Sequence, residues 1–318
     1  MSLDNPKVVI VGAGAIGGLF GGVLTEGGLD VTLLDVSAEH VTAIQDKGLH
    51  IVGHGGDRLV PIKATTDPTE VDPADVAIIQ CKALHTEAAV RAAMSIFTDD
   101  TVAVSFQNGL GNEEVIAGVI GENRVIGGLT AQGATVEAPG RIRNYSDLPT
   151  YIGELFGDGL GRLTPRVERI ARAFSQAGLD TRGSADIRRD MWKKLLGNIG
   201  LSATSGVTDL SSAEMVAIPE LAATIHRAVD EAHAVAVACG VDIPSGEKSE
   251  VLNKLTSTTA GTGVSKSSLC TDLRSQRATE IDYIYGTVSK LGAERGIPTP
   301  TLDTLISIVK GLESHYLK

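Results

Sequence analysis

Val8-Val9-Ile10-Val11-Gly12-Ala13-Gly14-Ala15-Ile16-Gly17-Gly18 joins a short apolar run to a glycine-rich turn that opens a helical pattern. In such a strand–turn–helix, Gly12 permits the tight turn, Gly14 lets the backbone approach a pyrophosphate, and Gly17 lets the helix pack against the strand. The free N–H groups at the helix N-terminus favour phosphates. A glycine-rich turn without a ligand is the alternative, and the second strand that follows disfavours it. The stretch therefore predicts a dinucleotide-binding turn made of Gly12, Ala13, Gly14, Ala15, Ile16 and Gly17.

Short β-branched runs alternate with helical patterns outward from this turn, as is typical of a parallel sheet covered on both faces. We expect strands at Lys7–Val11, Asp30–Leu34, Val76–Ile79, Thr101–Ser105 and Leu179–Arg182. We expect helices at Ala15–Thr25, Ala38–Lys47, His85–Ile96, Asn112–Val119 and Leu163–Gly178. Residues 125–154 look less regular, with short strand-like pieces at Arg141–Tyr145 and Tyr151–Gly153.

The composition changes near Arg182-Gly183-Ser184, where β-branched runs fade and long helical patterns begin. These patterns cover Asp186–Leu201, Pro219–Cys239, Gly246–Thr259, Leu273–Arg295 and Thr301–Ser314. Gly240 and Gly296 follow two of them, as glycine does at helix C-termini. We therefore predict an α/β Rossmann-type, doubly wound N-terminal domain over residues 1–184, which binds the dinucleotide, and an all-α C-terminal domain over residues 185–318.

The overall charge narrows the range of partners. The 318 residues carry a formal net charge of −11, and no Lys/Arg block is longer than a pair. Such a chain is a poor partner for nucleic acid or an anionic membrane. No apolar run reaches the roughly 20 residues that a membrane span needs. Cys81, Cys239 and Cys270 lack metal-ligand spacing and fit a reducing compartment, so we expect a cytoplasmic protein with no metal.

Polar residues that follow the predicted strands point to the dinucleotide. Asp35 ends the second strand, where a carboxylate accepts hydrogen bonds from ribose hydroxyls and repels a 2′-phosphate, so on physical grounds it favours NAD(H) over NADP(H). Lys82 and Asn108 lie in loops after later strands, and ligands of doubly wound sheets sit beyond the carboxyl ends of strands. From spacing alone, Lys82 is as well explained as a surface lysine and Asn108 as a turn residue.

A second group of polar residues lies in the helical half. Lys194, Asn198 and Ser202 are spaced by four residues, so they share one helix face, which suits a polar small molecule. Ser268 and Glu280 stand between apolar positions further on and fit a buried site. A solvated helix face with a surface lysine, and the wet side of an amphipathic helix, remain the alternatives. The sequence has no evident His–Asp pair for proton transfer, which leaves lysine as the leading acid/base candidate.

The whole chain resembles the ketopantoate reductase (2-dehydropantoate 2-reductase) family. The resemblance runs from the glycine turn through Lys82 and Gln107-Asn108-Gly109 to Trp192-Lys193-Lys194-Leu195 with Asn198, and ends with Ser267-Ser268 and Thr279-Glu280-Ile281-Asp282-Tyr283. It implies reduction of a 2-keto acid to a 2-hydroxy acid by NADP(H) or NAD(H), with ketopantoate giving pantoate in pantothenate biosynthesis. It further implies that Lys194 is the general acid and that Glu280 contacts the substrate. Substrate- or cofactor-contacting positions are then Asn108, Asn198 and Ser268, and more loosely Lys82.

Two residues depart from the family pattern. Ser202 stands where a second asparagine is usual, which should alter the substrate pocket, and Asp35 stands where a basic or neutral residue is common. Two other functions therefore stay open: an NAD-linked 2-hydroxy-acid dehydrogenase with a different substrate, and a non-catalytic dinucleotide sensor. The sequence gives neither the exact 2-keto acid nor the oligomeric state, for which a homodimer is one option.

Overall fold

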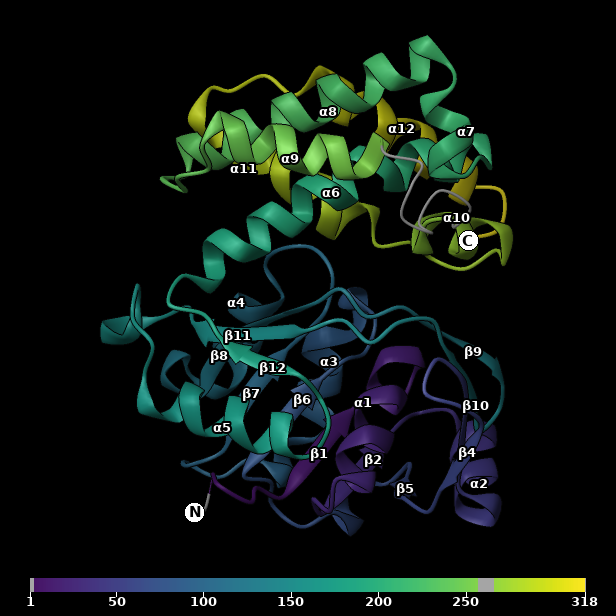
Figure 1. The fold of residues 1–318 in the computed structure, drawn as a ribbon, viewed down its shortest axis with the longest axis vertical. Helices are drawn as coiled ribbons and strands as arrows, with labels where there is room; N and C mark the ends of the chain where they lie inside the picture. The colour runs from purple at the N-terminus through teal and green to yellow at the C-terminus, as the bar shows by residue number, and fades with distance from the viewer. Residues whose placement is uncertain (1–2, 257–265, 318) are drawn as a thin grey trace. The chain divides into compact units, whose positions relative to one another are not determined.

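The computed structural model describes residues 3–256 and 266–317 (Figure 1). Contacts divide the chain into two compact units. The first unit holds residues up to 107 and 112–188, and the second holds residues 108–111 together with residues from 189 onward. A short loop, residues 108–111, therefore packs with the helical unit although its neighbours in sequence belong to the sheet.

The first unit is built on a mainly parallel sheet. Within the described residues this sheet has eight strands in the order β12-β11-β8-β7-β6-β1-β2-β5, and among the paired strands only β8 and β11 run antiparallel. Its strands are β1 (Val8–Val11), β2 (Val31–Leu34), β5 (Lys63–Thr65), β6 (Val76–Ile79), β7 (Val102–Ser105), β8 (Val125–Thr130), β11 (Thr150–Glu154) and β12 (Thr181–Gly183). The order reverses at β1 and β6, so the predicted doubly wound sheet is confirmed.

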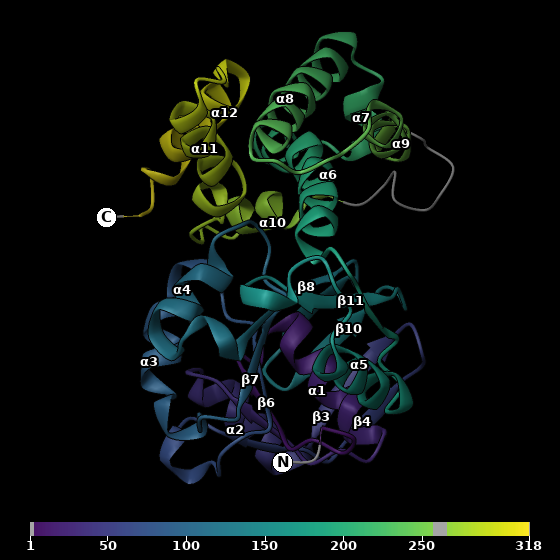
Figure 2. The same cartoon turned by 90° about the vertical axis from the view of Figure 1, so that its left-hand side faces the viewer.

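Helices cover both faces of this sheet, as Figure 2 shows. The covering helices are α1 (Ala15–Glu26), α2 (Ala38–Lys47), α3 (Thr86–Ala92), α4 (Asn112–Ile120) and α5 (Pro165–Gln176). Alternate residues of β1 enter different cores because successive strand side chains point to opposite faces. Val8 and Ile10 join the core under α1 and α5, and Val9 and Val11 join the core under α3 and α4. Burial on both faces explains why the strand reads as an unbroken apolar run.

A smaller sheet was not predicted. Its strands are β4 (Arg58–Val60), β3 (Leu49–Gly53), β10 (Arg141–Asn144) and β9 (Ala134–Ala138), in that order. It packs on α1, where Ile142 and Ile51 enter the same core as Phe20. Within residues 125–154, the strand-like pieces expected at Arg141–Tyr145 and Tyr151–Gly153 correspond to β10 and β11, whereas β8 and β9 were not predicted. β9 and β10 pair with each other as neighbours in sequence, but β10 also pairs with β3, a distant partner that a local pattern does not reveal.

The second unit is helical, as predicted, and its described residues include no strand. Its helices are α6 (Ile187–Thr208, which begins in the first unit), α7 (Ser212–Val216), α8 (Pro219–Ala238), α9 (Ser245–Thr256), α10 (Ser268–Arg274), α11 (Thr287–Arg295) and α12 (Pro300–Glu313). The single helix expected over Leu273–Arg295 is wrong: α10 ends at Arg274 and a π-helical turn, η6 (Asp282–Gly286), precedes α11. Residues 257–259 of the expected helix Gly246–Thr259 lie outside the described residues.

Candidate functional site

The glycine turn has the geometry that a dinucleotide needs. Gly12 has φ +104°, and a Cβ there would lie 2.5 Å from the backbone nitrogen of Cys81, so no other residue fits without a shift. A Cβ at Gly14 would meet no protein atom within 4 Å, so packing within the protein does not require glycine there. Helix α1 begins after Gly14 with no side-chain cap and no acidic residue in its first turn. Its first N–H groups are therefore available to an anion.

Asp35 is fixed beside this turn. Its Oδ2 accepts a hydrogen bond from Ala13 N at 2.7 Å, and its Oδ1 accepts one from Ser37 N at 2.8 Å. The carboxylate thus links the end of β2 to the glycine turn and to the start of α2. Val36, the next residue, is 98% exposed and brings no cation. The residues of the turn and Asp35 together fit a dinucleotide whose adenosine ribose carries no 2′-phosphate.

Gln107 is the hub of the loops at the ends of β6 and β7. It is 4% exposed, and its Nε2 donates to Cys81 O at 2.7 Å and to Thr86 Oγ1 at 2.8 Å. Its Oε1 accepts from Ser105 Oγ at 3.1 Å. The amide nitrogen therefore holds the segment around Lys82, while the amide oxygen is bound by the end of β7. In the sequence, Gln107 stands out only as the neighbour of Asn108, because its burial depends on the tertiary structure.

The second unit holds the candidate catalytic lysine. Lys194 lies on α6, and its Nζ donates a hydrogen bond to Asn108 Oδ1 at 2.9 Å. Asn108 belongs to the loop 108–111, so this contact joins two residues that are 86 positions apart within one unit. Asn198 and Ser202 follow Lys194 on α6, and Ser202 is 6% exposed. The structure therefore gives the ammonium an amide partner among the predicted site residues.

Lys193, the neighbouring lysine, has a different environment. Its Nζ pairs with Glu247 Oε2 at 2.5 Å, and Arg189 holds the other oxygen of the same carboxylate. The hydrogen bond from Lys193, with help from Arg189, lowers the pKa of Glu247 although burial acts in the opposite direction. Lys193 therefore ties α6 to α9, and the two adjacent lysines serve different faces of one helix.

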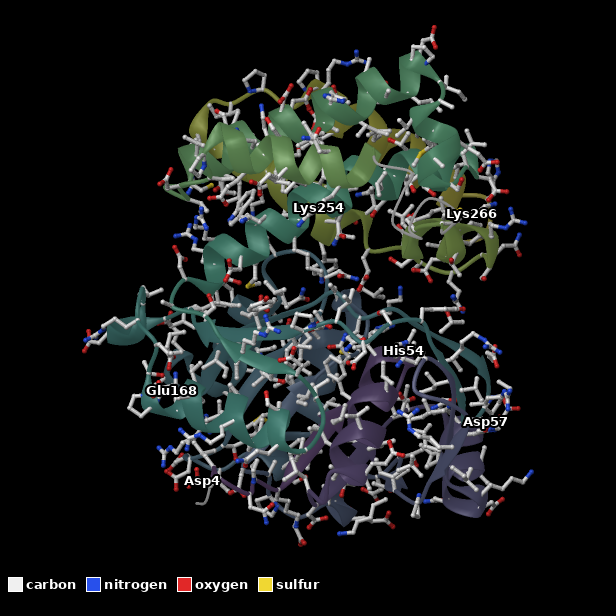
Figure 3. The ribbon with its side chains drawn as sticks, viewed as in Figure 1. Asp4, His54, Asp57, Glu168, Lys254 and Lys266 are labelled. Carbon is white, nitrogen blue, oxygen red and sulfur yellow. The ribbon has the colours of Figure 1, made fainter. Side chains whose placement is uncertain are left out.

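The end of α6 is fastened to the start of α10, where Ser268 lies. Ser267 Oγ accepts from Cys270 N at 3.1 Å and donates to Ser202 O at 3.1 Å. Asp209, just past α6, accepts a hydrogen bond from Nζ of Lys266 (labelled in Figure 3) at 2.6 Å. It also forms an ion pair with Arg274. These hydrogen bonds hold the pKa of Asp209 well below its usual range. Ser268 itself is exposed as the first residue of α10.

Glu280 lies between α10 and η6 rather than inside a long helix. It is 7% exposed, and its carbonyl accepts hydrogen bonds from Tyr283 N and Ile284 N, which start the π-helical turn. Burial of the side chain agrees with its place between apolar positions in the sequence. Its contact with the substrate stays a prediction.

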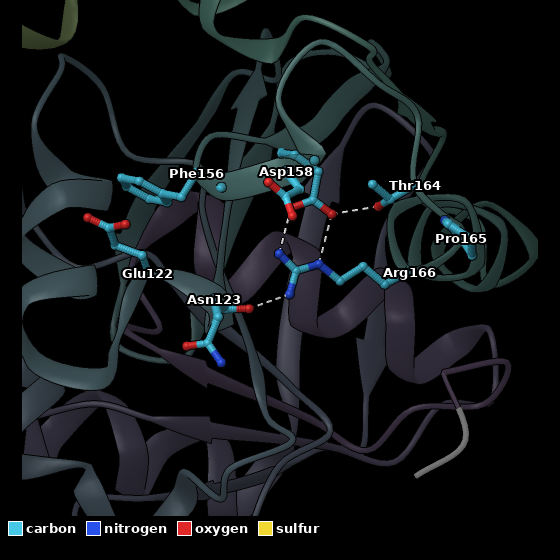
Figure 4. A pocket seen from close by; sticks show the side chains of 10 residues that line it. Glu122, Asn123, Phe156, Asp158, Thr164, Pro165 and Arg166 are labelled. Atoms are coloured by element: carbon cyan, nitrogen blue, oxygen red, sulfur yellow. Dashed lines mark hydrogen bonds and ion pairs between the residues drawn. The ribbon is translucent and has the colours of Figure 1, made fainter.

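A cavity of about 750 Å³ lies elsewhere in the first unit, at the start of α5 (Figure 4). Its lining includes an ion pair in which Arg166 Nε donates to Glu154 Oε1 at 2.8 Å, and Thr164 adds a further hydrogen bond to Glu154. Arg166 also donates to the carbonyl of Asn123. The lining includes no residue of the glycine turn, and these polar groups satisfy one another, so we assign the cavity no role.

The glycine turn with its carboxylate, and the lysine with its amide partner, fit a dinucleotide-dependent oxidoreductase that has a sheet-based unit and a helical unit. Among the described residues no helix is long and apolar enough to span a membrane.

Comparison with known proteins specifies the family. Residues 8–157 match the family model described as "Ketopantoate reductase PanE/ApbA", and residues 186–313 match its C-terminal counterpart. The chain is 32% identical to the 2-dehydropantoate 2-reductase of Halobacterium salinarum over 96% of its own length and 98% of that protein. The chain belongs to the ketopantoate reductase family.

Solved structures agree with this assignment. The chain resembles a ketopantoate reductase from Ralstonia eutropha with a TM-score of 0.89 and 27% identity, covering 98% of this chain and 100% of that one. It resembles a D-mandelate dehydrogenase, solved with NADH and anilino(oxo)acetate, with a TM-score of 0.91 and 27% identity, covering 98% and 99%.

Proposed function

We propose that this protein reduces a 2-keto acid to the corresponding 2-hydroxy acid, with ketopantoate as the first substrate to test. The dinucleotide, NADPH or NADH, supplies a hydride to the keto carbon when it is bound. Lys194 donates its proton to the keto oxygen, which gains negative charge as the new C–H bond forms. An ammonium at this point both stabilises the charge and completes the alcohol.

The contact between Lys194 and Asn108 carries this proposal. A lysine whose Nζ is held at 2.9 Å from an amide oxygen is oriented before any substrate binds. Orientation of this kind lowers the entropic cost of reaching the transition state. The roles of the other site residues remain proposals: Asn198, Ser202, Ser268 and Glu280 for the substrate, and the glycine turn, Asp35, Lys82 and Asn108 for the dinucleotide. We likewise propose domains at 1–184 and 185–318.

An NAD-linked 2-hydroxy-acid dehydrogenase is the second candidate, and Asp35 favours it. The carboxylate of Asp35 accepts a hydrogen bond from Ala13 N, and its negative charge would repel a 2′-phosphate at this point. The likeness to a D-mandelate dehydrogenase solved with NADH supports the same preference for NAD(H). Because Ser202 is shorter than an asparagine, we expect it to leave more room for a different side chain on the acid.

Steady-state kinetics with both dinucleotides decide between these candidates. The wild-type protein is assayed with NADPH and NADH against ketopantoate and a panel of other 2-keto acids, aromatic ones included. Highest kcat/KM on ketopantoate supports the reductase, and highest kcat/KM on another acid with NADH supports the dehydrogenase. Dinucleotide binding without turnover of any 2-keto acid would support the third function, a non-catalytic dinucleotide sensor. A cytoplasmic location and a homodimer stay proposals, and sedimentation of the purified protein tests the latter.

A further inference from the structure

The hydroxyl of Tyr285 hydrogen-bonds to two backbone groups of α6. The ring is 0% exposed in the core of the helical unit. The hydroxyl accepts a hydrogen bond from Ala203 N at 2.9 Å and donates one to Ile199 O at 2.5 Å. These two backbone groups are four residues apart, so in an ordinary α-helix they bond to each other. A side chain that enters this ladder is a recognised cause of helix bending.

The position of this insertion matters for the site. Ile199 and Ala203 each follow a candidate substrate-binding residue, Asn198 and Ser202. The hydroxyl therefore acts on the part of α6 between the Lys194 end and the Ser202 end of the candidate face. Burial raises the pKa of Tyr285, so its hydroxyl stays protonated and remains a donor to Ile199 O at any physiological pH.

The π-helical turn that carries Tyr285 also holds the loop 108–111. Tyr283 O accepts a hydrogen bond from Leu110 N at 3.1 Å, and Thr287 Oγ1 lies 3.4 Å from Leu110 O. A Cβ on Gly109, which has φ +88°, would lie 2.4 Å from Tyr283 O, so the loop backbone sits directly on the turn. Single π-turns of this kind occur often at functional sites.

We propose that Tyr285 is a positioning residue for the reaction. From η6 it sets the course of α6 between Asn198 and Ser202, while the same turn holds the loop whose Asn108 receives the Lys194 hydrogen bond. One turn thus fixes both partners of that contact. The inference rests on the proposed function, because it assumes that Lys194 is the acid.

Tyr285→Phe tests the proposal, since it keeps the ring and removes only the oxygen. Ile199 O and Ala203 N are then free to close an ordinary helical hydrogen bond, so the protein should fold with a melting temperature near that of the wild type. Misplacement of a reacting group by about 1 Å can cost on the order of 100-fold, so kcat should fall tenfold to 100-fold. The KM for the dinucleotide should not change, and deuterated NADH should show a larger isotope effect on kcat.

Controls separate positioning from stability. Tyr316→Phe removes a hydroxyl that donates to Arg277 O at 3.2 Å elsewhere in the unit, and it should keep wild-type kinetics. Thr287→Val should lower kcat severalfold through the loop, and Thr287→Ser should restore it. A folded Tyr285→Phe with wild-type kcat overturns the proposal. So does a Tyr285→Phe protein that does not fold, because the hydroxyl is then needed for stability.

Lys194→Ala in the same assay tells the two hypotheses apart. If Lys194→Ala loses turnover and Tyr285→Phe keeps it, only the positioning role fails. If Lys194→Ala turns over normally, the proposed acid is wrong. A wild-type protein that reduces no 2-keto acid removes the function and the positioning role together.

Discussion

At the scale of single residues, the two adjacent lysines show how a helix separates roles. Side chains one residue apart on an α-helix point about 100° apart. Lys193 bonds to Glu247 and Lys194 bonds to Asn108, so one side chain holds the helices together and the other enters the candidate site. Sequence alone gives the angle but not which lysine faces which partner.

Lys194→Ala should therefore cost far more activity than Lys193→Ala. General acid catalysis typically contributes about 10²–10⁴-fold, and kcat of the Lys194 variant should fall by that order while dinucleotide binding stays nearly intact. Lys193→Ala should lose little turnover and some stability, because it breaks the contact to Glu247. Initial rates on the best 2-keto acid, with fluorescence titration of NADH, measure both effects. Equal, mild losses in the two variants would reject the assignment and favour the sensor.

Asp35 should set the dinucleotide preference. Because its carboxylate lies at the glycine turn, NADH should be used at least as well as NADPH. Asp35→Arg should move the ratio of kcat/KM values toward NADPH by tenfold or more, which corresponds to about 1.4 kcal/mol. Asp35→Asn, which keeps the shape and loses the charge, should give a smaller shift. Strong NADPH preference in the wild type would mean that another group handles the 2′-phosphate.

At the scale of elements, the start of α5 is held by charge rather than by apolar packing alone. Glu154, at the end of β11, has a side chain that is 3% exposed and pairs with Arg166 on α5 (Figure 4). Burial by itself raises the pKa of Glu154, but the hydrogen bonds from Arg166 and Thr164 outweigh it, so the pKa is lowered overall. A pair of this kind is costly to break because the buried carboxylate then keeps only the Thr164 hydroxyl and loses its cation.

Arg166→Met should destabilise the protein by about 3 kcal/mol at pH 7, the lower end for a broken buried pair, since Arg166 is 28% exposed. The folded-state pKa of Glu154 lies below the unfolded value, so the pair's contribution is full at neutral pH and is lost as the pH falls through the folded-state pKa. The difference in melting temperature between variant and wild type should therefore be large at pH 7 and should shrink at acid pH. A difference in melting temperature that does not depend on pH would contradict this account; Arg162→Met on the nearby surface is the control.

At the scale of the whole molecule, the chain divides its tasks between units. The turn and carboxylate proposed to bind the dinucleotide lie in the sheet-based unit, and Lys194 with Asn108 lies in the helical unit. A net charge of −11 makes local cations and helix termini the means of attracting an anionic ligand. Binding and chemistry should therefore be separable by substitution.

Thermal shifts of the full-length protein test this separation. NADH at about 100 times its Kd should stabilise the folded state by about 2.7 kcal/mol. The same shift should appear in Lys194→Ala, because that substitution leaves the sheet-based unit unchanged. Gly12→Val, which places a side chain against Cys81, should abolish the shift. Loss of the shift in Lys194→Ala would show that the lysine serves binding rather than proton transfer.

The sequence by itself determined the features that depend on local pattern. The alternation of short apolar strands such as Val8–Val11 with helical patterns predicts the parallel sheet, because strands buried on both faces read as unbroken apolar runs. The spacing of Lys194, Asn198 and Ser202 predicts one helix face, because the helical period is constant. The family resemblance followed from motifs in the right order.

The tertiary structure alone decided what depends on distant partners. The small sheet pairs β3 with β10, 91 residues apart at Arg141 and His50, and no local pattern encodes such a pairing. The helix expected over Leu273–Arg295 is interrupted after Arg274, and it resumes with a π-helical turn whose Tyr283 O accepts a hydrogen bond from Leu110 N of the loop 108–111. Gln107 became a hub only once its amide was buried. In each case, hydrogen-bond partners that are distant in sequence outweigh local propensity, since a buried polar group must be satisfied wherever its partner lies.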